Sequence, residues 1–148
     1  MTPNEITREL VTAGKSLIAV LDEESEALGQ VKLARVTELN DAKENAATQY
    51  ETVMTTVRAH PEVLAATGPD ERRALIAIKD ELDHATLRNI NALRAAMEMN
   101  RRLVQTIASS IERQRTSASG YTKTGAAYSR TQLSTGADMM PVSLNETF

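Results

Sequence analysis

Apolar residues recur at intervals of three, four and seven positions along two long stretches of this chain, and neither stretch contains an internal proline. Such spacing places side chains on one face of an α-helix. The first stripe consists of Ile6, Leu10, Leu17, Leu21, Leu28, Val31, Leu39, Ala42, Ala46, Tyr50, Val53 and Val57. The second consists of Leu75, Ile78, Leu82, Ala85, Asn89, Leu93, Ala96, Asn100, Leu103, Ile107 and Ile111. The sequence therefore predicts two long amphipathic helices, over about residues 3–58 and 69–116.

Helix start and stop signals bound both stretches. Thr2, Pro3 and Glu5 form the pattern of a capping box with proline at the first helical position. The run 67–71, Thr-Gly-Pro-Asp-Glu, repeats a capping residue, a proline and first-turn acids. Pro61 ends the first helix, because the residue before proline avoids the helical region. The short connection, with a single turn over 61–67, predicts that the two helices run antiparallel.

Two features interrupt the regular pattern. The first stripe drifts between Val31 and Leu39, where Arg35 stands on it, so we expect a local change of packing there. Gly29 is a candidate bend, because glycine weakens a helix interior. Asn89 and Asn100 lie on the second stripe, and polar residues on such a seam fix helix alignment at some cost in stability.

The charges predict one pairing between the helices. Four acids of the first helix, Asp22, Glu23, Glu24 and Glu26, form a run of the kind that usually lies on a solvated face. Folding the chain about residue 64 brings this run near Arg101 and Arg102. Surface pairs of this kind are worth only about 0 to 1 kcal/mol each, so we expect them to select alignment rather than to supply stability.

The composition changes at residue 117, where small polar residues replace the apolar pattern. We therefore expect an all-α fold with two parts: a long, coiled-coil-like antiparallel helical hairpin over 1–116 and a flexible or partly helical tail over 117–148. The last residues, 139–148, regain Met, Val, Leu and Phe. This ending is typical of a docking segment and equally of a terminus that folds back on the hairpin.

The residue types exclude several classes of chemistry. There is no cysteine, and the two histidines, His60 and His84, stand on separate segments without companion ligands. No phosphate-binding or nucleophile motif is present. We therefore expect no catalytic residues, no metal and no cofactor. A net charge of −3 argues against a nucleic-acid binder. No apolar run is long enough to span a bilayer, and no signal peptide is evident, so we expect a cytoplasmic protein without membrane insertion.

The core of such a chain must be thin. Hydrophobic residues make up 41% of it but aromatic residues only 3%, so Leu, Ile, Val, Met and Ala must form a narrow seam between helices. More apolar side chains are present than this seam can cover. The surplus predicts a third helix, a second copy of the chain or a client protein as an additional partner. Met97 and Met99 are adaptable contacts of the kind found on promiscuous binding surfaces.

The sequence resembles the FlgN family of flagellar chaperones. In the first helix the resemblance lies in Glu24, the pair Ala27-Leu28, Leu33, Val36, Leu39 and the pair Lys43-Glu44. In the second it lies in Asn89, Leu93, Ala96, Asn100, Arg101, Leu103, Val104 and Ile107. Gly120-Tyr121, followed by Gly125, is similar to the family's tail signature. Lys32 departs from the family pattern, in which an Asp is common. The resemblance covers roughly residues 10–125.

The resemblance implies a flagellar type III export chaperone, which is not an enzyme. Such proteins bind the hook-associated proteins FlgK and FlgL in the cytoplasm through the client's terminal helix and deliver them to the export gate. The residues that it implies for client binding are Leu103, Ile107, Ile111, Val142, Leu144 and Phe148, and the residue that it implies for docking on the gate is Tyr121. The alternative reading is a self-associating structural or regulatory coiled-coil protein, and a homodimer is compatible with both.

Overall fold

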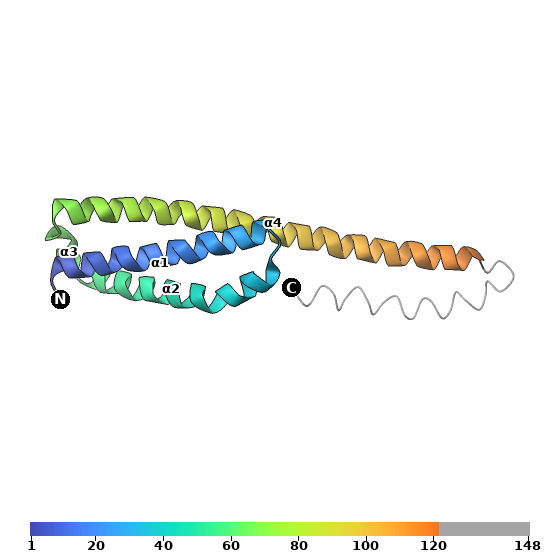
Figure 1. The fold of residues 1–148 in the computed structure, drawn as a ribbon, viewed down its shortest axis with the longest axis horizontal. Coiled ribbons are helices and arrows are strands. Elements are labelled where there is room, and N and C mark those ends of the chain that lie inside the picture. The colour runs from blue at the N-terminus through green and yellow to red at the C-terminus, as the bar shows by residue number, and fades with distance from the viewer. Residues whose placement is uncertain (122–148) are drawn as a thin grey trace. The chain divides into compact units, whose positions relative to one another are not determined.

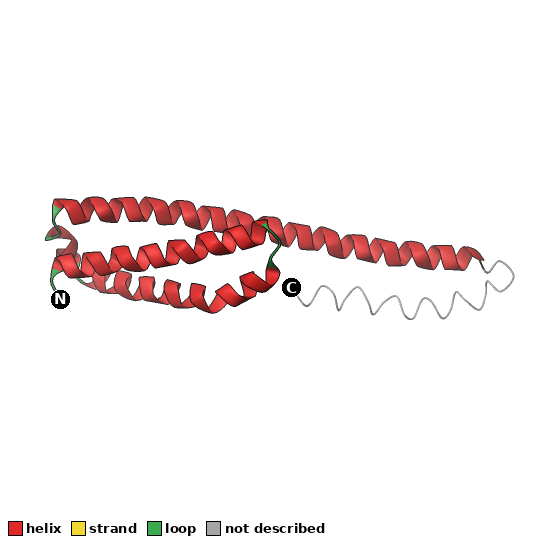
Figure 2. Ribbon diagram, viewed as in Figure 1, coloured by secondary structure: helices red, strands yellow, loops and turns green. Residues whose placement is uncertain are grey.

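The computed structural model describes residues 1–121 and the side chains of residues 1–118. This part of the chain folds into four helices: α1 (Pro3–Gly29), α2 (Leu33–Ala59), the short α3 (Pro61–Ala65) and α4 (Pro69–Tyr121). The predicted all-α class is confirmed, and no strand occurs within these residues (Figure 2). Contacts divide the chain into two units, Met1–Ala96 and Met97–Phe148, and α4 runs from the first into the second.

The first unit is a bundle of α1, α2 and the first part of α4 (Figure 1). Contacts fix the helix directions. Arg8 pairs with Glu71, and Asp22 pairs with Arg88, so α1 and α4 run parallel. Lys43 meets Glu24, whereas Tyr50 lies near Gly14, so α2 runs antiparallel to α1. The antiparallel pairing predicted for residues 3–58 and 69–116 therefore holds for α2 with α4, whereas α1 runs parallel to α4.

The single helix predicted over residues 3–58 is wrong, because the chain turns back at residues 30–32. The N–H of Lys32 donates to the carbonyl of Ala27 at 2.8 Å, and the N–H of Val31 donates to that of Leu28 at 3.1 Å. These are the two hydrogen bonds of a Schellman helix end. The expected change of packing near Val31 is therefore a reversal of chain direction, which supplies a third helix, one of the three partners that the apolar surplus left open.

The helix starts are only partly as predicted. The capping box at α1 is confirmed: Thr2 accepts from the Glu5 N–H, and the Glu5 carboxylate accepts from the Thr2 N–H. At α4 the carbonyl of Gly68 accepts the first helical hydrogen bond. Thr67 instead lies buried between α3 and α1, with its hydroxyl 3.1 Å from that of Thr7. The second helix begins at Pro69 as predicted and continues past residue 116 to Tyr121.

The core of the first unit is thin, as the shortage of aromatic residues predicts. One apolar cluster lies near the α3 end and consists of Ile6, Leu10, Val53, Val57 and Val63, with Tyr50, Met54 and Leu75 packed against it. Further along the bundle, small residues let the helices approach closely. A Cβ atom added at Gly14 would stand only 2.9 Å from Cγ1 of Ile78, so glycine is required there by the packing of α1 against α4.

Candidate protein-binding surface

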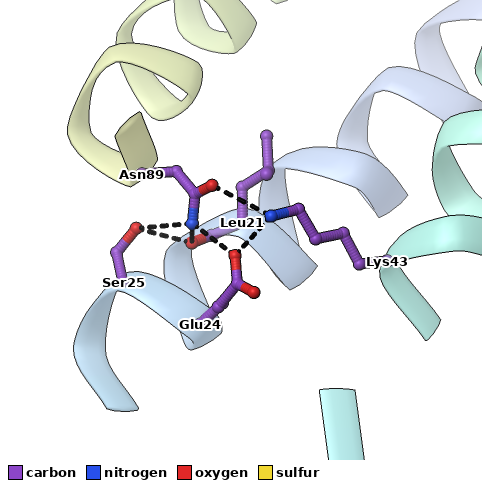
Figure 3. Close-up of polar contacts among 5 residues, drawn as sticks. All are labelled: Leu21, Glu24, Ser25, Lys43 and Asn89. Carbon is purple, nitrogen blue, oxygen red and sulfur yellow. Dashed lines mark hydrogen bonds and ion pairs between the residues drawn. The ribbon is translucent and has the colours of Figure 1, made fainter. Parts of the chain in front are cut away.

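A cluster of polar side chains is buried where α1, α2 and α4 meet (Figure 3). The Glu24 carboxylate on α1, only 3% exposed, is its centre. One of its oxygens, Oε2, accepts from Nζ of Lys43 on α2 and from Nδ2 of Asn89 on α4, each at 2.6 Å. Nζ of Lys43 also donates to Oδ1 of Asn89 at 3.1 Å. One carboxylate oxygen therefore ties three helices together.

The cluster is a closed network. Asn89 Nδ2 also lies 3.4 Å from the carbonyl oxygen of Leu21 and 3.3 Å from the hydroxyl of Ser25. No buried side-chain nitrogen or oxygen in the described part of the chain lacks a hydrogen-bond partner. Buried polar groups that are fully paired specify one alignment of helices, because any shift would leave a charge unpaired in the interior. We infer that this cluster sets the alignment of the bundle rather than binding a ligand.

The sequence predicted only part of this cluster. Asn89 was expected to fix alignment, and its burial agrees with that role. Glu24 was expected on a solvated face with its acidic neighbours, and this expectation is wrong. A signal was present, since Glu24 stands three residues after Leu21 and four before Leu28, on the apolar stripe. Lys43 as its partner was missed, because that contact depends on the turn at residues 30–32.

The predicted pairing of the acidic run with Arg101 and Arg102 is also wrong. Asp22 binds Arg88 at 2.7 Å, and Glu23 binds Arg35. Both Arg101 and Arg102 bind Glu98 within α4. The reason is again the turn at residues 30–32, which folds α1 back along the first part of α4 and sets a different alignment from a hairpin folded about residue 64.

The described side chains of the second unit belong to one amphipathic helical segment, residues 97–118 of α4. Projected at 3.6 residues per turn, its apolar side chains fall on one half of the helix and its charged ones mostly on the other. Leu103 is 57% exposed, Met97 71% and Ile107 42%. Met99 is exposed and Ile111 is half-buried. We call the apolar half, formed by Met97, Met99, Asn100, Leu103, Val104, Ile107 and Ile111, the α4 apolar face.

The charged half of this segment is organised by Glu98. Its carboxylate accepts from Arg101 at 2.7 Å and from Arg102 at 2.9 Å. The hydrogen bonds from Arg101 and Arg102, with the charges of the same guanidinium groups, lower the pKa of Glu98 to about 2. The pairs lie three and four residues apart, the spacings at which helix side chains interact. They support a helix whose other half offers apolar side chains.

The predicted site residues divide into two groups. Leu103, Ile107 and Ile111 stand at intervals of one turn on the α4 apolar face, where a binding helix could reach them. Tyr121 is the last residue of α4, and its side chain lies outside the described residues, as do Val142, Leu144 and Phe148. The structure therefore brings together the helical part of the predicted client site.

The histidines do not form a metal centre with neighbouring acids within the described residues. His60 contacts Glu62 at 3.0 Å, and residues 1–121 contain no group of three His, Cys, Asp or Glu side chains able to hold a metal. Among the described helices, none combines the length and apolar character needed to cross a membrane.

Comparison of the chain with protein-family models, with curated proteins and with solved structures gives no match.

Proposed function

We propose that this protein is a chaperone that binds a helical segment of another protein on the α4 apolar face. The observation that carries the proposal is the exposure of Leu103 and Ile107 on one half of an amphipathic helix. A helix with one apolar half is stable in water when that half is covered by a partner. Ion pairs on the charged half can also stabilise the helix. The Glu98 pairs provide such support while the apolar half stays accessible.

The mechanism is helix-against-helix recognition. A client segment with apolar side chains at intervals of three and four residues can pack along Leu103, Ile107 and Ile111, as other amphipathic helices pack into apolar grooves. Met97 and Met99 are unbranched and can adapt to differing client side chains. Coverage of the client's own apolar stripe prevents its aggregation, and the modest area of a single helix face keeps the complex reversible.

The sequence resemblance to the FlgN family supports a role of this activity in flagellar type III export. We propose that the clients are hook-associated proteins of the FlgK and FlgL type, bound in the cytoplasm through their terminal helices. Delivery to the export gate would use Tyr121 as the docking residue, with Val142, Leu144 and Phe148 extending the client site. These roles rest on the sequence resemblance, whereas the helix-binding role rests on the exposed side chains of residues 97–118.

Calorimetric titration with synthetic terminal helices of hook-associated proteins tests the proposal. Replacing Leu103 and Ile107 by Ser should weaken client affinity by about 10-fold or more for each residue, the loss expected when a buried aliphatic contact is removed. The matched control replaces Ile76 and Leu87 by Ser, because these aliphatic residues are at least as exposed as Ile107 and lie on the part of α4 in the first unit. Equal affinities of the two double variants would refute the proposal.

The alternative function is self-association through the same α4 apolar face. It is favoured by Asn100, which stands on this face among aliphatic residues and could select one pairing of identical helices. A dimer that dissociates in the variant with Ser at 103 and 107, together with no binding of client helices, would support this alternative.

A further inference from the structure

The turn between α1 and α2 contains a residue in an unfavourable backbone conformation. Val31 has φ of +57°, in the left-handed region, and it occupies the position of the Schellman end where glycine normally stands. A β-branched side chain there is an outlier, because its Cβ crowds the backbone. Gly29, which could adopt this conformation freely, stands two positions too early and lies within α1. The turn is therefore strained.

The two helix ends at the turn also lack charges that would favour them. The last turn of α1 carries Glu26 and no basic residue, although the end of a helix favours positive charge. The first turn of α2 has no acidic residue, and its cap, Lys32, makes no side-chain capping hydrogen bond. Both helix ends disappear if residues 29–33 become helical and join α1 to α2. A continuous helix would thus remove the strain at Val31 and the start of α2, which has no side-chain cap, and would replace the Schellman hydrogen bonds of α1 by helical ones.

The core faces of α1 and α2 are compatible with such a continuous helix. Seven large aliphatic residues are buried in the two helices, namely Ile6, Leu10, Leu21, Leu28, Leu39, Val53 and Val57. In one uninterrupted α-helix they would all fall within roughly 60° of each other around the axis. Leu28 and Leu39 are separated by about three whole turns, so the turn could open without rotating either face away from the core.

We propose that two copies of this chain exchange α1 by opening the turn at residues 30–32, which forms a domain-swapped dimer. Each bundle then contains α2, α3 and the first part of α4 from one chain and α1 from the other. The contacts of α1 with the other helices are rebuilt between the two chains, including the cluster in which Glu24 of one chain meets Lys43 and Asn89 of the other. A chain that opened alone would lose that cluster and expose a buried carboxylate. The second copy is therefore the partner that the opened chain requires.

The exchange concerns residues 1–96 and does not depend on the proposed client binding. Two substitutions at Val31 test it, and neither removes a buried contact, because the residue is 54% exposed. Val31→Gly relaxes the left-handed turn and weakens a continuous helix, whereas Val31→Ala favours the helix. Since each dimer contains two hinges, the Gly variant should dimerise at least about 100-fold more weakly than the Ala variant after refolding at high concentration. Light scattering on a sizing column measures this difference.

A cross-link identifies the swapped contact. The sequence contains no cysteine, so Glu23→Cys and Arg35→Cys can be placed in separate Val31→Ala chains. These positions face each other between α1 and α2. A short bis-maleimide should join the two kinds of chain when they are refolded together and should join neither kind refolded alone. Monomeric Val31→Ala protein at every concentration would overturn the proposal, as would dimers that give no cross-link between positions 23 and 35.

Discussion

At the scale of single residues, the Asn89 side chain links the members of the buried polar cluster. Its amide joins Glu24 and Lys43, and it also approaches the Leu21 carbonyl and Ser25. The Glu24 carboxylate that accepts from this amide belongs to a buried residue. Removing the amide therefore leaves charged groups with fewer partners inside the bundle, and such losses are more costly than the net value of one hydrogen bond.

Asn89→Ala should lower the free energy of unfolding by about 1 to 3 kcal/mol, because the buried carboxylate loses a hydrogen bond that water cannot replace. Urea denaturation followed by circular dichroism measures the change. Asn91→Ala is the matched control, since Asn91 is exposed on the same helix two residues away. If the two variants are equally stable, Asn89 does not hold the helices in alignment.

The sequence predicted the position of a residue well where that position depends on spacing within one helix. The stripe through Leu103 and Ile107 follows from helical spacing alone, and so does the place of Asn89 on a seam. The requirement for glycine at residue 14 could not be predicted, because it arises from a side chain on another helix, Ile78. In the sequence alone Gly14 is only a residue that weakens α1.

At the scale of helices, the turn at residues 30–32 explains most differences between prediction and structure. No proline stands there, and Gly29 does not occupy the left-handed position, so local signals favour a continuous helix. Packing prevails over these signals, because turning back lets α1 contact both α2 and α4 and buries a wider apolar surface. Helix existence and type were therefore predictable, whereas the chain reversal and the partners of Glu24 and Asp22 were not.

The segment 97–118 allows one prediction about pH. Because Arg101 and Arg102 lower the pKa of Glu98 to about 2, its carboxylate should remain ionised at pH 3. Its ordinary pKa is 4.5, so the contribution of these pairs to helix stability is complete above that pH and is lost as the pH falls toward 2. Carbon-13 NMR of the labelled carboxylate measures the titration directly.

In that titration Arg101→Ala should raise the midpoint of Glu98, because the guanidinium that makes the largest contribution is removed. Arg113→Ala is the control. The Arg113 guanidinium lies further along the same helix than Glu98 and donates to the Ser109 carbonyl. A midpoint near 4.5 in the unsubstituted protein would show that the arginines do not hold Glu98 in solution.

At the scale of the whole molecule, the two units differ in how their helices are stabilised. Residues 1–96 form a bundle with a buried core and a closed polar cluster. The described side chains of residues 97–118 belong to one helix supported by pairs within it, such as Glu98 with Arg101. A helix stabilised by pairs between its own residues opens more readily than core helices, which open only with the fold. This contrast is the physical basis of the proposed division between a scaffold and a binding segment.

Amide hydrogen exchange, measured by mass spectrometry with and without a client terminal helix, tests this division most directly. Without client, amides of residues 97–118 should exchange much faster than the core amides of residues 1–96. A saturating client helix should slow exchange within 97–118 and leave the core amides unchanged. Equal protection of both regions in the free protein, or client protection confined to residues 1–96, would contradict the assignment of the α4 apolar face as the binding surface.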